Sequence, residues 1–225
     1  MQLQAVRHPA RYSVKLLPTL SLYLAGSERI LDPFGGVGGI FALAPFLPGS
    51  QIEAVEIEPE WAGQDPRVTV GNALALPWPA GAFDAVCTSP CYGNRMADHH
   101  EAYDASRRNT YRHALGRPLH PDNAGQLQWG DEYRDFHWRA WTEARRVLAP
   151  GGRFVLNIKD HIRDGERVRV TDWHAGALLA LGFHLVKRTE VKCPGQRRGA
   201  NGHLRVATES VILFELECNA TAREN

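Results

Sequence analysis

The sequence predicts an α/β fold: a seven-stranded, mostly parallel sheet with helices on both faces. Three observations support this prediction. A short apolar strand ending at Asp32 runs into a glycine-rich turn, and an apolar pattern restarts at Ile40, as in the first strand–turn–helix unit of a Rossmann-like fold. Further short apolar runs alternate with segments of helical periodicity. The last two runs are joined by a basic loop and are expected to form a hairpin.

Seven segments have the composition and length of strands. The fourth, residues 83–88, is apolar throughout its middle, as expected of a strand buried on both faces. The helix between the second and third strands must be very short. The predicted strands span residues 29–32, 51–57, 67–70, 83–88, 153–158, 183–191 and 210–217.

Helical spacing is clearest in residues 131–148, where large apolar side chains recur on one face and Pro150-Gly151-Gly152 ends the pattern. The tryptophans of this segment are expected in the core. Residues 12–25 predict an earlier helix, interrupted at Pro18, and a short helix follows the glycine turn. A last helix is predicted over residues 171–181, with Thr171 or Asp172 as its N-cap.

The composition is that of one globular domain spanning residues 1–225. Apolar residues make up 44% and charged residues 23% of the chain, and the net charge is +1, so any nucleic-acid contact must come from local patches. The lack of a signal peptide and of a long apolar run favours a cytoplasmic protein. The four cysteines lack C-x-x-C spacing, which indicates neither a zinc site nor a disulfide framework.

The turn Asp32-Pro33-Phe34-Gly35-Gly36-Val37-Gly38-Gly39 has the glycines of a nucleotide-binding loop but lacks its usual partners. It has no P-loop lysine, and Phe41 occupies the third glycine position of the dinucleotide fingerprint. The negative charge of Asp32 would repel a pyrophosphate. It suits a ligand with a positively charged group, such as the amino group of a methionine moiety. For this loop alone, a turn that binds nothing is the alternative.

Two other strands carry polar groups at their carboxyl ends. Glu56 ends the second strand, where it could accept hydrogen bonds from ribose hydroxyls, although it also belongs to an acidic stretch that could be a solvated surface. Ser89-Pro90-Cys91-Tyr92 follows the fourth strand, which lies beside the first at the switch point where open α/β sheets bind ligands. Alone, this tetrapeptide is an ordinary proline turn. With the glycine turn and Glu56 in the correct order, it indicates a site.

These segments resemble the S-adenosylmethionine-dependent amino-methyltransferases that act on DNA bases at cytosine N4 or adenine N6. The glycine turn is similar to their cofactor motif, and residues 89–92 are similar to their Ser/Asp/Asn-Pro-Pro-Tyr motif. Residues 8–12 are similar to the segment that precedes the glycine motif in DNA members, and Gly71-Asn72-Ala73 is similar to a Gly-Asp-Ala motif. The similarity covers roughly residues 8–92 and 131–217.

The resemblance implies a class I methyltransferase fold with S-adenosyl-L-methionine as cofactor. The chain departs from the family at Cys91, where a second proline is usual, and at Asn72, whose amide oxygen can still accept from the adenine amino group. The cofactor-binding residues that the resemblance implies are Pro9, Tyr12, Asp32, Phe34, Gly35, Gly38, Glu56, Asn72 and Ala73.

The resemblance also implies the catalytic residues Ser89, Pro90 and Tyr92. An exocyclic amine is a poor nucleophile because its lone pair is delocalised into the base. The Ser89 hydroxyl and the Pro90 carbonyl would accept the amine's N–H groups and favour a pyramidal nitrogen, while Tyr92 would stack on a base taken out of the helix. Cys91 is not needed as a nucleophile. The serine form of the motif favours cytosine N4 over adenine N6.

Two segments are expected to contact the nucleic acid. Residues 192–205 carry four basic residues and no acid, and residues 93–130 form a long insertion of the kind that serves as a target-recognition lid. The pair His99-His100 lacks a clear third metal ligand, so no metal site is predicted. The candidate nucleic-acid-binding residues are Lys192, Arg197, Arg198, Arg205, Arg107 and Arg108.

Three alternatives remain open at this point. An RNA base methyltransferase would use the same site, and only residues 8–12 favour DNA. A nicotinamide-dependent oxidoreductase is disfavoured by Phe41 and Asp32. A module that binds S-adenosylmethionine without transferring its methyl group is suggested by Cys91.

Overall fold

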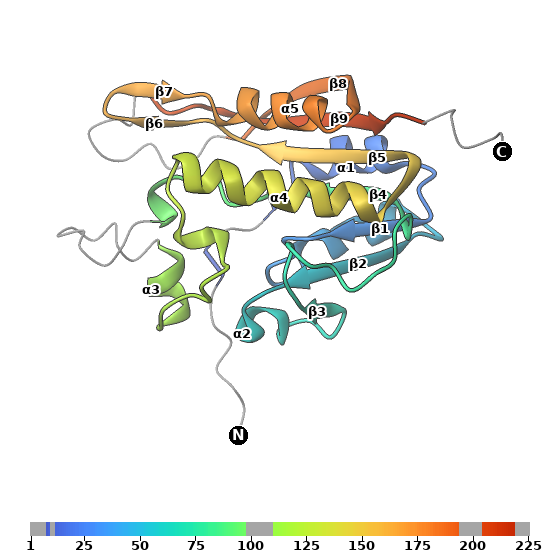
Figure 1. Cartoon of the computed structure of the whole chain (residues 1–225), viewed down its shortest axis with the longest axis horizontal. Helices are drawn as coiled ribbons and strands as arrows, with labels where there is room; N and C mark the ends of the chain where they lie inside the picture. The colour runs from blue at the N-terminus through green and yellow to red at the C-terminus, as the bar shows by residue number, and fades with distance from the viewer. Residues whose placement is uncertain (1–7, 10–11, 98–109, 194–203, 219–225) are drawn as a thin grey trace.

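The computed structural model describes residues 8–9, 12–97, 110–193 and 204–218 (Figure 1). Its main sheet has seven strands in the order β3-β2-β1-β4-β5-β9-β8. Strands β1 to β5 pair in parallel, whereas β9 is antiparallel to both of its neighbours. The strands are β1 (Arg29–Asp32), β2 (Gln51–Glu56), β3 (Val68–Val70), β4 (Phe83–Thr88), β5 (Leu148–Ile158), β8 (Phe183–Lys192) and β9 (Thr208–Leu216). The predicted fold class and the terminal hairpin are confirmed.

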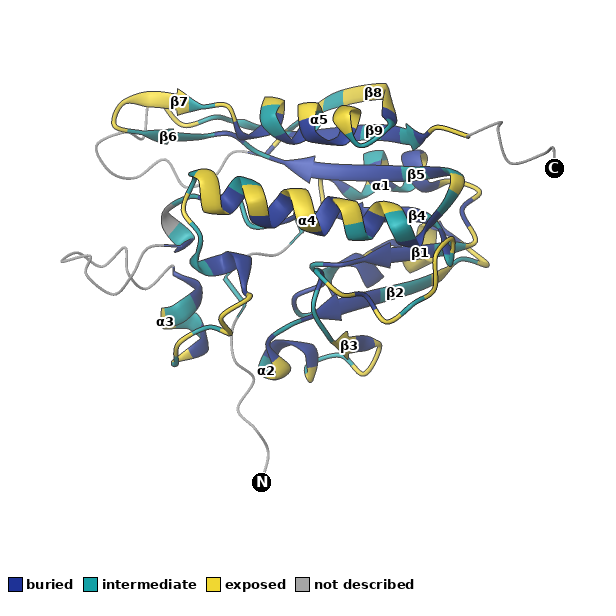
Figure 2. Cartoon of the chain, in the orientation of Figure 1, coloured by how far each residue is buried: buried dark blue, intermediate teal, exposed yellow. Residues whose placement is uncertain are grey.

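Helices cover both faces of this sheet. On one face lie α1 (Leu17–Leu24) and the 3-10 helix η1 (Gly39–Phe46), and on the other lie α4 (Asp131–Val147) and α5 (Val170–Ala180). Successive strand residues point to opposite faces: Ile30 packs with the α1 side and Leu31 with the α4 side. Figure 2 shows the central strands as the most buried part of the molecule. The alternation explains why the central strands are apolar on both faces.

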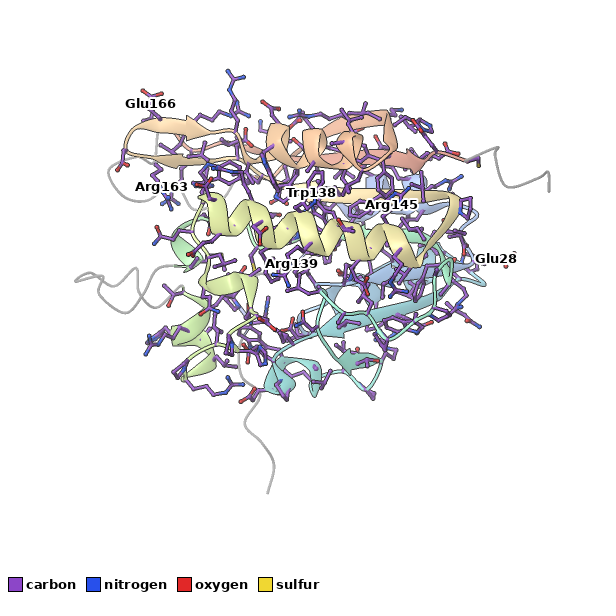
Figure 3. The ribbon with its side chains drawn as sticks, in the orientation of Figure 1. Glu28, Trp138, Arg139, Arg145, Arg163 and Glu166 are labelled. Carbon is purple, nitrogen blue, oxygen red and sulfur yellow. The ribbon has the colours of Figure 1, made fainter. Side chains whose placement is uncertain are left out.

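The helix α4 is amphipathic, as its spacing predicted. Its inner face buries Tyr133 and Trp141 without exposed surface, so Trp141 is a core residue as expected. Its outer face carries Trp138, Arg139 and Arg145, all exposed and labelled in Figure 3. Trp138 retains 40% of its surface, and the expectation that both tryptophans are core is therefore wrong for Trp138.

Two helices near the amino terminus differ from the prediction. α1 begins at Leu17 with Pro18 in its first turn, so Pro18 starts this helix and does not interrupt one that begins at residue 12. The missing N–H of a proline costs little there, because first-turn N–H groups have no intrahelical partner. The segment after the glycine turn is an eight-residue 3-10 helix that includes Pro45, and this proline lacks the N–H that an α-helical turn would need at that position.

An unpredicted hairpin follows β5. Strand β6 (His161–Arg163) pairs antiparallel with β7 (Glu166–Val168). Between them, Asp164 and Gly165 have φ of 51° and 80°, which is the left-handed geometry of a two-residue hairpin turn. The dipeptide Asp-Gly is a strong hairpin signal, so the sequence contained the information for this element.

The start of α5 also differs from the prediction. Its N-cap position is Arg169, so neither Thr171 nor Asp172 caps the helix. The backbone N–H of Thr171 donates instead to Asp160 Oδ1 at 2.8 Å. A carboxylate distant in sequence therefore satisfies an N–H that a local side chain was expected to satisfy.

The described part of the insertion is ordered by contacts with the sheet edge. It contains η2 (Arg95–Ala97), α3 (Tyr111–Leu115) and η4 (Ala124–Gln126). Tyr111 and Leu115 of α3 pack against Trp61 of α2 (Pro59–Ala62), the very short helix expected between β2 and β3. Figure 1 shows α3 beside the end of the sheet that bears α2. The expected lid is thus, over residues 110–130, a packed part of the domain.

Candidate active site

A cavity of about 1140 Å³ lies at the carboxyl ends of the parallel strands. The glycine turn after β1, Glu56 at the end of β2, Asn72 after β3 and Ser89 after β4 all line it. Because parallel strands end at one edge, residues far apart in sequence meet there. The predicted site residues that line this cavity are Pro9, Tyr12, Phe34, Gly35, Glu56, Asn72, Ala73, Ser89, Pro90 and Tyr92.

The glycine turn is tied to the neighbouring strand β2. Gly35 N–H donates to the Val55 carbonyl at 2.8 Å, and Gly36 N–H donates to Glu56 Oε2 at 3.1 Å. Gly36 and Gly38 have φ of 54° and 83°, which only glycine adopts without cost. Gly38 does not line the cavity. Its left-handed backbone conformation lets the chain turn into η1.

Asp32 lies beneath the turn and has no exposed surface. Its Oδ1 accepts from Thr88 Oγ1 at 2.8 Å and from Phe34 N–H at 3.0 Å, and its Oδ2 accepts from the Tyr12 hydroxyl at 3.3 Å. Burial raises the pKa of Asp32 to about 6, against the opposing effect of these hydrogen bonds. Hydrogen bonds to Asp32 therefore connect β1 with β4 and with the amino-terminal segment. The contact of Asp32 with a ligand amino group stays a prediction.

Glu56 lies at the opposite side of the turn and is 9% exposed. Its Oε1 accepts from Glu58 N–H at 2.9 Å, while Oε2 accepts from Gly36. Burial, with a smaller contribution from the Glu58 charge, raises the pKa of Glu56 to about 7. The Ile57 N–H is a third backbone donor to this carboxylate, whose four lone-pair sites therefore leave one for a hydroxyl donor.

Glu58 has no exposed surface, although it belongs to the acidic stretch for which a solvated surface was an alternative. It accepts from Arg117 Nη2 at 2.8 Å, from His120 N–H at 2.7 Å and from Asn123 Nδ2 at 2.8 Å. All three donors come from the insertion. Local sequence gives no sign of this role, because the partners lie about 60 positions away.

Asn72 connects the loop after β3 to the insertion. Its Oδ1 accepts from Leu74 N–H at 2.9 Å, and its Nδ2 donates to Asp122 Oδ2 at 3.0 Å. Asp122 lines the same cavity. The amide of Asn72 is therefore oriented by two protein partners.

The turn after β4 ends in a polar cluster. Ser89 Oγ and Tyr92 Oη are 2.8 Å apart, and Asn157 Nδ2 lies 3.2 Å from each. Asn157 Nδ2 also donates to Glu209 Oε2 at 3.0 Å. We name Ser89, Tyr92, Asn157 and Glu209 the serine cluster. All four residues line the cavity.

Sequence reasoning missed Asn157 and Glu209. Asn157 is next to last in β5, and Glu209 is second in the antiparallel strand β9, so both reach the edge where β4 ends. The predicted strands 153–158 and 210–217 place Asn157 near this edge, but Glu209 lies outside the second of them and its pairing with Asn157 was not predicted. A polar residue inside the apolar run 153–158 was the available signal.

Cys91 faces the insertion and not the serine cluster. It packs against the cluster of Trp61, Tyr111 and Leu115, and the Tyr111 hydroxyl forms a hydrogen bond with its sulfur. Burial raises the pKa of the Cys91 thiol to about 12. A thiol with this pKa stays protonated near neutral pH and is a poor nucleophile.

A buried chain of hydrogen bonds holds the backbone of this turn from behind. Trp141 Nε1 donates to His174 Nδ1 at 3.0 Å, so His174 carries its proton on Nε2, 2.8 Å from the Tyr133 hydroxyl. Tyr133 in turn donates to the Cys91 carbonyl at 2.6 Å. Burial lowers the pKa of His174 well below its usual value, which keeps the ring neutral. We name Trp141, His174 and Tyr133 the relay.

The predicted nucleic-acid contacts are only partly within the described residues. Lys192 and Arg205 are exposed at the two ends of the β8–β9 connection and do not line the cavity. Arg107, Arg108, Arg197 and Arg198 lie outside the described residues, as do His99 and His100.

Within the described ranges, no three His, Cys, Asp or Glu side chains gather as metal ligands. None of the helices in those ranges has the length and apolar content needed to cross a bilayer.

Comparison with known proteins supports the fold. No family model matches the sequence, and no curated protein is significantly similar to it. A SAM-dependent methyltransferase structure from Methanosarcina mazei has a TM-score of 0.60 at 14% identity, covering 93% of this chain and 100% of that one. TrmN from Thermus thermophilus has a TM-score of 0.55 at 19% identity, over 89% of this chain and 48% of TrmN. This chain thus spans about half the length of TrmN.

A third similar structure is the cyclase SpnF, with a TM-score of 0.54 at 15% identity over 95% of this chain and 86% of that one. The fold is therefore that of class I methyltransferases, in which enzymes of more than one chemistry occur. Because the fold alone does not fix the reaction, the function has to be argued from the cavity.

Proposed function

We propose that this chain is an S-adenosylmethionine-dependent methyltransferase that modifies the N4 amine of cytosine in DNA. The observation that carries this proposal is a single cavity lined by both the glycine turn and the Ser89-Pro90-Cys91-Tyr92 turn. Its volume of about 1140 Å³ exceeds the range usual for one drug-sized ligand, ~300–1,000 Å³, and leaves room for a cofactor and a base.

The residues at the cofactor end of the cavity have the chemistry that S-adenosylmethionine requires. Gly35 and Gly36 keep the turn close against β2, so that the cavity floor is backbone. Glu56 can accept from a ribose hydroxyl, and none of the described residues that line the cavity is a lysine or arginine that would favour a pyrophosphate. When bound, this cofactor supplies an electrophilic methyl group on a sulfonium.

The substrate end fits an exocyclic amine. Ser89 can donate its hydroxyl hydrogen to Tyr92 and accept from Asn157, which leaves an Oγ lone pair for one amine N–H. The Pro90 carbonyl would accept the second N–H. These acceptors are fixed before the base arrives, so they favour the pyramidal nitrogen of the transition state without reorganisation.

Methyl transfer to an amine releases a proton, and one residue of the cavity is a candidate to accept it. As the amine nitrogen bonds to the methyl carbon, the carbon–sulfur bond breaks and the nitrogen must lose a proton. Glu209 is the carboxylate of the serine cluster, and Asn157 holds it beside Ser89. We assign Glu209 the role of accepting that proton.

The choice of cytosine and of DNA rests on the sequence. A serine in the first position of the tetrapeptide favours cytosine N4, and residues 8–12 are similar to the DNA members of the family. The structure adds that Pro9 and Tyr12 of this segment line the cavity. Lys192 and Arg205 lie exposed at the base of the loop that precedes Glu209, where they can contact phosphates.

The test is nucleoside mass spectrometry after incubation with methyl-deuterated S-adenosylmethionine and unmodified DNA or RNA, separately. We expect labelled N4-methylcytosine in DNA. Label in adenine would change the base, and label only in RNA would change the polymer. Cofactor binding without label would indicate a binding module or another reaction. Binding of NAD(H) in place of S-adenosylmethionine would overturn the whole proposal.

A pair of variants separates the chemistry from folding. Ser89→Ala should lower kcat by at least about tenfold with the Kd of the cofactor unchanged. Ser21→Ala is the matched control, since Ser21 is only partly buried on α1, does not line the cavity and donates its hydroxyl to the Pro18 carbonyl of the same helix. Equal losses of turnover and of cofactor affinity in Ser89→Ala would show that Ser89 is structural.

A further inference from the structure

The end of the cavity beside β3 is closed by the insertion and not by the loop after β3 alone. Asp122 lines the cavity there, and its Oδ2 accepts from Asn72 Nδ2 at 3.0 Å. Among the described residues, Asp122 Oδ1 accepts no hydrogen bond. An exposed carboxylate oxygen thus remains available at the mouth of the cavity.

The buried carboxylate of Glu58 fixes the residues that flank Asp122 on both sides. His120 N–H and Asn123 Nδ2 both donate to Glu58, at 2.7 Å and 2.8 Å. Glu58 has no exposed surface and Asn123 is 8% exposed, so this stretch is anchored in the domain. Asp122 N–H donates to His120 Nδ1 at 3.1 Å, which completes a tight turn. Asp122 is therefore held in place before any ligand binds.

Strand order predicts which part of the cofactor reaches Asp122. Under the proposed function the reactive methyl would lie near Ser89 after β4, and the ribose would lie at Glu56 after β2. Adenine is attached to the ribose on the side away from the sulfur. The next strand outward from β2 is β3, so adenine would lie beside the hydrogen-bonded pair Asn72 and Asp122.

The two residues offer unequal hydrogen-bonding capacity to that base. Asn72 Oδ1 accepts from Leu74 N–H, which leaves it one lone pair, and its Nδ2 is directed to Asp122. Asp122 keeps one carboxylate oxygen for a donor, and the exocyclic N6 amine is the donor of adenine on that edge. We propose that Asp122, supplied by the insertion and oriented by Asn72, recognises the adenine amine of the cofactor. This inference rests on the proposed function.

The test compares two ligands by isothermal titration calorimetry: S-adenosylhomocysteine and its 6-oxo counterpart, S-inosylhomocysteine. The natural protein should prefer the amine, since the 6-oxo group places an acceptor against the carboxylate. Asp122→Asn should bind S-adenosylhomocysteine about tenfold more weakly. It should also bind the 6-oxo ligand more tightly than the natural protein does, because the new amide can donate to the oxygen.

Two further variants make the result decisive. Asp122→Ala should lose the preference without reversing it. Asp135→Asn is the matched control: Asp135 is exposed on α4, pairs only weakly with Arg139 at 3.9 Å and does not line the cavity. Equal thermal midpoints would exclude unfolding as the cause of the losses.

The possible failures are distinguishable. If the natural protein binds S-adenosylhomocysteine and Asp122→Asn keeps both its affinity and its preference, this inference is wrong and the proposed function stands. If the natural protein binds neither S-adenosylhomocysteine nor S-adenosylmethionine, the proposed function fails first, and the inference fails with it.

Discussion

Tyr133 donates its hydroxyl to the carbonyl oxygen of Cys91 across 2.6 Å, and this bond ties α4 to the turn that bears Ser89 and Tyr92. The carbonyl lies one residue after the Pro90 carbonyl, so its direction constrains the acceptor that we assign to the substrate amine. His174 and Trp141 fix the tyrosine from behind. The relay therefore positions the turn without touching the substrate.

Removing the relay hydroxyl should affect turnover more than cofactor binding. Tyr133→Phe leaves the Cys91 carbonyl and His174 Nε2–H without their partner, and we expect kcat to fall about tenfold, ~1.4 kcal/mol in activation free energy. The KM of the cofactor should change little. The control is Tyr23→Phe, because Tyr23 is also buried and hydrogen-bonded, to Thr189 at 2.6 Å, but packs on the opposite face. Equal kinetic effects of both variants would refute a positioning role for Tyr133.

The amide of Asn157 should be needed to keep Glu209 and Ser89 in their relative places. Asn157→Asp puts two carboxylates about 3 Å apart, and like charges at that distance raise the pKa of the pair. Turnover should fall by at least about tenfold at pH 8 and less at pH 6, where the pair can share a proton.

The matched test of this pair exchanges its two groups. Combining Asn157→Asp with Glu209→Gln restores one amide and one carboxylate, and should recover part of the lost turnover at pH 8. A double variant as inactive as the single one at every pH would mean that repulsion is not the cause of the loss.

Asp32→Asn should make the ligand-free protein more stable above pH 6. The amide can keep the bonds from Thr88 and Phe34 to its oxygen and can donate to the Tyr12 hydroxyl. The folded pKa of Asp32 is about 6, against 3.8 for an aspartate freely exposed to water, so burial of its charge destabilises the fold. This penalty is absent below pH 3.8, grows as pH rises and is complete above pH 6.

Denaturant titrations at pH 4 and pH 7.5 would measure this effect. The gain from Asp32→Asn should approach about 3 kcal/mol at pH 7.5 and be small at pH 4. The same variant should weaken S-adenosylmethionine binding if the Asp32 charge attracts the ligand amino group, as the sequence predicted. A gain in stability that does not depend on pH would show that charge burial is not its cause.

Alkylation should distinguish the cysteines. Cys218 is exposed, whereas Cys87 is buried and the pKa of Cys91 is raised to about 12. Iodoacetamide at pH 8 should label Cys218 in the native protein and leave Cys87 and Cys91 unlabelled, as read by peptide mass spectrometry. Cys91→Ala should keep methyl transfer within about threefold, ~0.7 kcal/mol. Loss of all turnover, with Cys218→Ser fully active, would give the thiol a chemical role.

Much of the fold follows from the sequence because its signals are local. The periodicity of α4, the glycine turn and the apolar β4 each depend on residues close together in the chain. The same local logic places Glu56 and Ser89 at one edge of the sheet, since strand direction fixes which ends meet. The starts of α1 and α5 differ from the prediction because a proline or a distant carboxylate satisfies the first turn.

The parts that the sequence did not predict depend on long-range pairs. Glu58 has the local surroundings of a solvated acidic stretch, and its partners Arg117, His120 and Asn123 belong to the insertion. The pairing of Asn157 with Glu209 likewise needs the register of β5 against β9, which composition does not specify. In both cases the role of a polar residue depends on hydrogen-bond partners in a segment distant in sequence.

The buried carboxylate of Glu58 also bears on how this chain can be shortened or recombined. Replacing residues 110–126 with a segment of similar packing that lacks Arg117, His120 and Asn123 would leave the Glu58 carboxylate buried without these three donors. An unpaired buried charge is destabilising by several kcal/mol, ~3–5 when one partner of a buried pair is lost. Grafting another insertion onto this sheet would therefore require replacing Glu58 at the same time, and the two segments have to be exchanged as a unit.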